Sequence, residues 1–173
     1  EKATKFYNNF NGGIALNNRL VVITNNEIVK DEYSKSMDIT FVDGQYIDVL
    51  KLVRDMIHQG CRIITHPLMG SIKPNETPYR SIIVEKGTSL DFNSLAIIES
   101  SIASFEKFTS NNKPIQWEEK TLRDFRFVDL KLFESALNSI NSWIMQERWR
   151  IIIKSNSWTG GKGMSKIYDV VLI

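Results

Sequence analysis

The chain has 173 residues, with 22 Lys and Arg against 20 Asp and Glu, and a formal net charge of +2. This length suits one domain with a substantial core, and 42% apolar and 24% charged residues exclude wholesale disorder. The balanced charge argues against a nucleic-acid binder, the single cysteine excludes an internal disulfide, and the apolar runs are too short to span a bilayer, so we expect a soluble cytoplasmic protein.

Residues 1–17 show no sustained periodicity, and we expect an unstructured leader there. Leu20–Thr24 is a β-branched apolar run that predicts a buried strand. A short polar helix at Glu27–Lys35 and a second strand at Ile39–Val42 are expected to follow. From Tyr46 to Ile57 the apolar residues fall on one helical face, which makes this the most clearly defined helix.

Gly60 suits the position just past the end of that helix, where a left-handed backbone costs glycine little. Cys61–Thr65 predicts a third strand. A long loop, His66–Arg80, then leads to a fourth strand at Ser81–Glu85. The direction of the fourth strand relative to the third stays open, because a loop of this length allows either a parallel or an antiparallel neighbour.

Ser89 or Asp91 is expected to cap a long helix that reaches about Phe108. Phe125–Leu130 is a candidate fifth strand, and Leu130–Ile144 carries the apolar stripe of a last helix. Strands that alternate with helices predict an α/β fold. We therefore predict a single three-layer domain over residues 18–148, with a mainly parallel sheet of four to five strands flanked by helices.

Polar residues follow the first three predicted strands, at the edge where parallel sheets bind ligands. They are Asn25 and Asn26 after the first strand, Asp43 after the second, and Thr65 and His66 at the third. These residues are candidates for ligand binding. The alternative is that Asn, Asp and Gly simply end the strands and begin the helices.

The His66–Arg80 loop is the strongest candidate for a ligand-binding or partner-binding site. It holds three of the four prolines, and loops of this length without internal structure are usually functional or disordered. It also gathers donors for phosphate or carboxylate groups and a glycine for close approach, namely Gly70, Ser71, Lys73, Asn75, Thr77, Tyr79 and Arg80. The alternative is a rigid connector whose side chains cap its own turns.

His66 is the candidate acid–base residue, because the pKa of histidine lies near neutrality. No Ser-His-Asp order and no HExxH motif accompanies it, so the sequence names no catalytic mechanism. The chain also lacks a glycine-rich nucleotide motif in its folded part and a cluster of metal ligands. We therefore expect no cofactor and no metal.

Four segments resemble the GrdX family: Arg19–Asn25, Tyr46–Leu50, Phe127–Leu130 and above all the stretch THPLMGSIKPNETPY at Thr65–Tyr79. This family comprises small proteins encoded beside the glycine, sarcosine and betaine reductases of amino-acid-fermenting clostridia. The resemblance, which covers about residues 18–148, implies an anaerobic bacterial cytoplasm, Stickland-type fermentation and reductase components as partners. It supplies no catalytic role.

The two ends of the chain do not fit that family. Met164–Ile173 resembles the first residues of a thioredoxin reductase, and the chain stops before the glycine-rich flavin loop, so we expect no FAD. Our hypothesis is that residues 1–15 and 149–173 are translated intergenic sequence and the start of the next gene. The alternative for the tail is a genuine strand at Ile167–Ile173, added to the sheet edge.

Three functional hypotheses follow. The first is a noncatalytic accessory protein that binds a reductase component or a small anionic ligand through the His66–Arg80 loop and the neighbouring strand ends. The second is an enzyme acting on a small anionic metabolite, with His66 transferring a proton and Lys73 and Arg80 holding the anion. A third and weaker hypothesis is a purely structural domain. Convergence of these side chains on one pocket would favour a small molecule, and their spread over a flat face would favour a protein partner.

Overall fold

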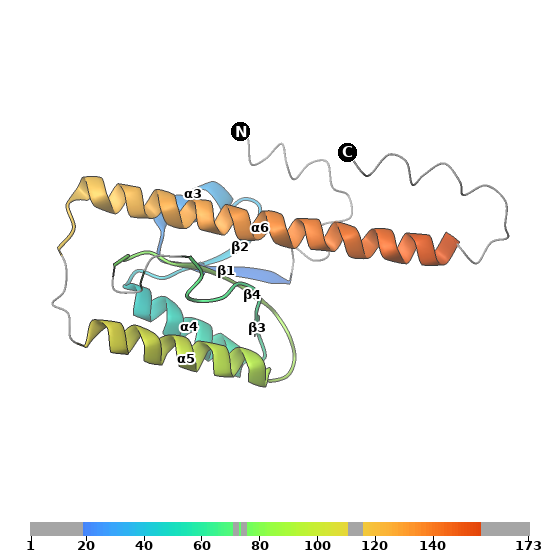
Figure 1. Cartoon of the computed structure of the whole chain (residues 1–173), viewed down its shortest axis with the longest axis horizontal. Coiled ribbons are helices and arrows are strands. Elements are labelled where there is room, and N and C mark those ends of the chain that lie inside the picture. The colour runs from blue at the N-terminus through green and yellow to red at the C-terminus, as the bar shows by residue number, and fades with distance from the viewer. Residues whose placement is uncertain (1–18, 71–72, 74–75, 111–115, 157–173) are drawn as a thin grey trace. The chain divides into compact units, whose positions relative to one another are not determined.

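The computed structural model describes residues 19–70, 73, 76–110 and 116–156 (Figure 1). The chain divides into two compact units, Glu1–Ala136 and Leu137–Ile173, and the first of them holds the sheet. The predicted leader, and residues 157–173 of the predicted tail, lie outside the described residues.

Four strands form one sheet in the order β2-β1-β4-β3. The strands are β1 (Leu20–Thr24), β2 (Asp38–Phe41), β3 (Arg62–Ile63) and β4 (Ser81–Glu85). Strand β1 runs parallel to β2, but β4 runs antiparallel to both β1 and β3. The α/β class and the strand number are confirmed, whereas the expected mainly parallel sheet is wrong. The loop between β3 and β4 contains no crossover helix in its described residues, so the chain turns back and pairs antiparallel.

Helices flank this sheet: α3 (Glu27–Tyr33), α4 (Tyr46–His58), α5 (Phe92–Thr109) and α6 (Glu119–Asn156). All five residues of β1 and of β4 are buried. Val21 and Ile23 of β1 join the core that α4 and α5 complete, with Val53 and Ile98 among its fully buried residues. In Figure 1, α4 and α5 lie on one side of the sheet, and α3 lies on the other with the first part of α6.

The ends of the elements follow local chemistry. Asn26 caps α3 by accepting a hydrogen bond from the backbone N–H of Ile28 at 3.1 Å, and Asp91 caps α5 by accepting one from Ser94 at 2.6 Å. Gly60, just past α4, has φ +99°, and a Cβ there would lie 3.1 Å from the carbonyl oxygen of Gly87. This position therefore requires glycine, as the sequence predicted.

The expected strand at Phe125–Leu130 is wrong, because these residues form part of α6. Burial there follows a helical spacing: Asp129, Leu130 and Phe133 are buried, whereas Phe127 and Val128 are exposed. The apolar run therefore covers two faces of a helix, and its strand-like composition is misleading. The last predicted helix is confirmed within α6, whose backbone remains helical through Asn156.

Candidate functional site

Asn25, directly after β1, binds the protein's own backbone. Its side-chain Oδ1 accepts a hydrogen bond from the N–H of Arg80 at 2.8 Å. Its Nδ2 donates to the carbonyl oxygens of Pro78 at 2.8 Å and Gly44 at 3.1 Å. The side chain is buried, and both ends of its amide are engaged. Asn25 therefore positions the end of the 66–80 loop.

Asn26 is fully buried and joins α3 to the first part of α6. Besides capping α3, it donates from Nδ2 to Oδ2 of Asp129 at 2.9 Å and to the carbonyl oxygen of Arg126 at 2.8 Å. Its role in the structure is thus to hold two helices. Asn25 and Asn26, both candidates for ligand binding, use their side-chain amides for contacts within the protein.

Asp129 of α6 is the buried carboxylate that sequence reasoning missed. It accepts hydrogen bonds from the backbone N–H of Ser81 at 3.0 Å and from its hydroxyl at 2.7 Å, in addition to that from Asn26. The hydroxyls of Ser81 and Thr24 are 2.7 Å apart. Burial raises the pKa of Asp129, although the hydrogen bonds from Asn26 and Ser81 and the charge of Arg80 act to lower it. The available signal was an acidic residue inside an apolar run.

Thr65, just before the loop, is a buried anchor, whereas His66, the first residue of the loop, has an exposed imidazole. Thr65 is buried, and its Oγ1 accepts a hydrogen bond from the backbone N–H of Ile83 at 2.8 Å. His66 is exposed, and its Nδ1 accepts a hydrogen bond from the N–H of Leu68 at 3.1 Å. Thr65 therefore stabilises the loop, and His66 is the member of this pair that a partner can reach.

Arg80, the last residue of the loop, is only 4% exposed. Its Nε donates a hydrogen bond to the Tyr46 hydroxyl at 2.8 Å, and its Nη2 donates to the carbonyl oxygen of Met69. The Tyr46 hydroxyl in turn donates to the carbonyl oxygen of Pro67 at 2.9 Å. Burial raises the pKa of Tyr46, and the nearby charge of Arg80 opposes that shift. Arg80 and Tyr46 together attach the start of the loop to α4.

Two other predicted site residues, Lys73 and Asp43, are exposed, whereas Arg80 is buried. The Nζ of Lys73 is 3.6 Å from Oε1 of Glu76. Ser71 and Asn75 lie outside the described residues.

Gly70 serves the packing of the loop against α6. It has φ +105°, and a Cβ at this position would lie 2.9 Å from Cδ1 of Leu132. A larger residue would therefore push the loop away from the helix. The close approach that the sequence predicted occurs, but within the protein.

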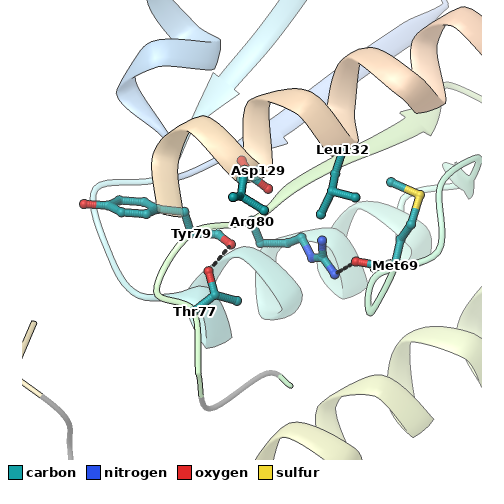
Figure 2. A pocket seen from close by; sticks show the side chains of 7 residues that line it. Met69, Thr77, Tyr79, Arg80, Asp129 and Leu132 are labelled. Atoms are coloured by element: carbon teal, nitrogen blue, oxygen red, sulfur yellow. Dashed lines mark hydrogen bonds between the residues drawn. The ribbon is translucent and has the colours of Figure 1, made fainter. Parts of the chain in front are cut away.

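A small pocket lies between the loop and α6 (Figure 2). Its lining residues are Met69, Thr77, Tyr79, Arg80, Val128, Asp129 and Leu132. Its cavity volume is about 10 Å³, which is room for about one water molecule. Thr77, Tyr79 and Arg80 were predicted site residues, but neither His66 nor Lys73 lines this pocket. The predicted acid–base residue and the predicted anion-binding pair therefore do not share it.

These features define the class of the molecule: an α/β protein with a mixed sheet, in which a proline-rich loop is anchored to two helices. Among the residues described, no group of three or more His, Cys, Asp or Glu side chains is placed to hold a metal ion. Within the same residues, no helix is both long and apolar enough to cross a membrane.

A family model of GrdX-like proteins matches residues 21–138, which is more than half of the chain. The chain therefore belongs to the GrdX-like family, and the resemblance seen in the sequence is confirmed. No match was found among curated proteins or among solved structures. The matched segment contains nearly the whole sheet, the 66–80 loop and the pocket residues of α6.

Proposed function

We propose that this protein is an accessory component of the glycine, sarcosine and betaine reductase system, and that it binds a reductase component through the surface of its 66–80 loop. Membership of the GrdX-like family supports the link to these reductases. The proposal places the protein in the cytoplasm of an organism that ferments amino acids by the Stickland route.

One observation carries the choice of a protein partner over a small ligand: the predicted binding residues are spread apart. His66 and Lys73 are exposed on the loop, whereas Arg80 and Asn25 are buried in contacts with the backbone. Small-molecule sites usually enclose most of their ligand in a cavity of about 300–1,000 Å³. The pocket at Arg80 has room for about one water molecule, so it is too small to enclose a metabolite. An exposed loop on a rigid scaffold suits a protein partner.

The enzyme alternative has less support. General acid–base chemistry requires the proton-transferring group within hydrogen-bond reach of the bound substrate. His66 is absent from the walls of the pocket that Arg80 lines, and its Nδ1 is engaged by Leu68.

A binding experiment with separately purified reductase components tests the proposal. We expect one component to bind the full-length wild-type protein, and the exposed-loop variants His66→Ala and Lys73→Ala to bind it more weakly. Lys51→Ala is the matched control, because Lys51 is exposed on α4 and outside the loop. Failure of every component to bind at micromolar concentration would contradict the proposal.

A thermal-shift screen with glycine, betaine, acetyl phosphate and inorganic phosphate tests the enzyme alternative. A ligand that binds the native state raises the melting temperature by mass action. We expect no shift with any of the four. A saturable shift that His66→Ala removes would favour the enzyme instead.

A further inference from the structure

The guanidinium of Arg80 is buried without a close counter-ion. In the part of the chain that the structure describes, no carboxylate lies within 4.0 Å of its nitrogens. Among the described residues, the guanidinium donates to two neutral acceptors, the Tyr46 hydroxyl and the backbone carbonyl oxygen of Met69. These use two of the five N–H donors of an arginine. A buried cation in this state is stabilised by an additional anionic partner.

The nearest candidate within the protein, Asp129, is already engaged. Its oxygens accept the hydrogen bonds from Ser81 and Asn26, and it lies beyond ion-pair distance of Arg80. Both Arg80 and Asp129 line the pocket, and Figure 2 shows the arginine extending from its strand end toward Met69 beneath α6. The Nη1 group of Arg80 has no acceptor among the described residues. Arg80 therefore has N–H donors left over at a pocket that it lines.

Exposed apolar side chains and two ion-paired cations lie on α6 at and beside the pocket. Val128, which lines the pocket, is 37% exposed, and its neighbour Phe127 is 55% exposed. The ammonium group of Lys131 lies 5.2 Å from the Phe127 ring centroid. The guanidinium of Arg126 lies 5.1 Å from the ring centroid of Tyr79, another lining residue. Both cations are already paired, Arg126 with Glu119 at 2.9 Å and Lys131 with Glu134 at 2.6 Å, so the charge that this surface offers an anion is that of Arg80, beside exposed apolar side chains.

The size of the pocket selects among anionic ligands. With room for about one water, it admits the tip of a side chain but does not enclose a free metabolite. We infer that the pocket receives one carboxylate oxygen of an Asp or Glu side chain from a partner protein, which binds Arg80 while apolar neighbours pack on Phe127 and Val128. The inference rests on the proposed function only for the identity of that partner.

Two pairs of peptides test this recognition without any reductase component. Each is an end-blocked pentapeptide with the central residue flanked by leucine, one pair carrying Glu or Gln and the other Asp or Asn. In NMR titrations of the ¹⁵N-labelled full chain, we expect an acidic peptide to shift the Arg80 Nε resonance and the Val128 amide. Its uncharged partner should bind at least about tenfold more weakly, as for the loss of a charge-assisted hydrogen bond.

A substitution at the mouth of the pocket gives the second test. Val128→Asp places a competing carboxylate there, and Val128→Asn is the control of equal size without charge. We expect the Asp variant to bind the acidic peptides at least about tenfold more weakly than the Asn variant. Amide spectra of both variants establish that the fold is retained, which is expected because Val128 is exposed on α6.

The outcomes separate this inference from the proposed function. Equal affinity within each peptide pair, or an Arg80 resonance that does not move, would overturn the inference. So would saturation by free acetate at lower concentration than by the acidic peptides, because that result indicates a metabolite site. If the peptide pattern holds but no reductase component binds, the inference stands and the proposed function fails. If a component binds but the acidic peptides bind no more tightly than their uncharged partners, the function stands and the inference fails.

Discussion

Asp129 on α6 accepts two hydrogen bonds from Ser81, the first residue of β4, although 48 residues separate them in the chain. The backbone N–H of Ser81 reaches Oδ1 at 3.0 Å, and its hydroxyl reaches Oδ2 at 2.7 Å. This pair joins the first part of α6 to a central strand of the sheet. Two lining residues of the pocket lie at this contact, namely Asp129 itself and Arg80, which directly precedes Ser81.

We expect Asp129→Asn to destabilise the protein. An amide offers one oxygen where the carboxylate offers two, so a buried donor of Ser81 or Asn26 is left without its acceptor. The cost of such a group is about 1–3 kcal/mol, which urea denaturation measures as a lower unfolding free energy. The control is Asp124→Asn, an exposed site on the same helix, where a change within about 0.5 kcal/mol is expected. Equal stability of the two variants would contradict the role assigned to Asp129.

The raised pKa of Asp129 predicts that the stability of the protein depends on pH. Burial raises the pKa of Asp129 above its ordinary 3.8, so the folded state retains this proton at pH values where the unfolded chain has lost it. The contribution of Asp129 to stability is then greatest below the ordinary pKa and falls as pH rises through the folded-state value. The amide that replaces this carboxyl group in Asp129→Asn does not titrate, so the variant lacks this contribution.

Urea denaturation of the wild type and Asp129→Asn from about pH 4 to neutrality tests this sign. We expect the wild type's advantage in unfolding free energy to shrink as pH rises. An advantage that grows with pH would show that the hydrogen bonds from Ser81 and Asn26 outweigh burial and hold the pKa low.

Local signals in the sequence predict much of the fold. The β-branched run at β1, the apolar face of α4 and Gly60 were placed correctly, and Asp91 is one of the two predicted caps of α5, since each depends on periodicity or on the chemistry of a helix end. The direction of β4 was not predictable in this way, because strand pairing is a tertiary property. The strand predicted at Phe125–Leu130 was wrong for a related reason: an apolar run of six residues does not show which of its faces is buried.

The sequence located the loop but not the roles of its residues. Asn25 and Arg80 were expected to face a ligand, and the structure shows them bonded to each other through the Arg80 N–H and buried. Residue type alone predicts only which hydrogen bonds are available, and the fold decides whether a backbone group takes them. Asp129 was missed because its partner Ser81 lies 48 residues away.

We expect Asn25→Ala to loosen the end of the loop. The substitution removes the acceptor of the Arg80 N–H and the donor to the carbonyl oxygens of Pro78 and Gly44. A loss of about 2–4 kcal/mol is expected from unsatisfied buried groups, partly offset by water that enters. Hydrogen exchange should also show a faster rate at the Arg80 amide.

Asn93→Ala is the matched control, because Asn93 is exposed on the first turn of α5. It should leave exchange at Arg80 unchanged and stability within about 0.5 kcal/mol. If the Arg80 amide exchanges as slowly in Asn25→Ala as in the wild type, Asn25 does not position the loop.

Tyr46→Phe isolates the hydroxyl group that links α4 to both ends of the loop. The aromatic ring should keep its packing against Phe105, whose centroid is 5.3 Å away. The variant loses the hydrogen bond to the Pro67 carbonyl and leaves the buried Nε of Arg80 without its acceptor. We expect a loss of about 1–3 kcal/mol at neutral pH and faster exchange at the Met69 amide.

An alkaline series distinguishes this hydroxyl from a general packing effect. Burial raises the pKa of Tyr46 above 10.0, so the unfolded chain loses the phenol proton at lower pH than the folded protein does. The stability that the protonated phenol contributes is therefore present below pH 10 and is lost as pH rises through the folded-state value. Wild-type unfolding free energy should fall more steeply above about pH 9.5 than that of Tyr46→Phe. Parallel curves for the two proteins would mean that Arg80 cancels the effect of burial on Tyr46.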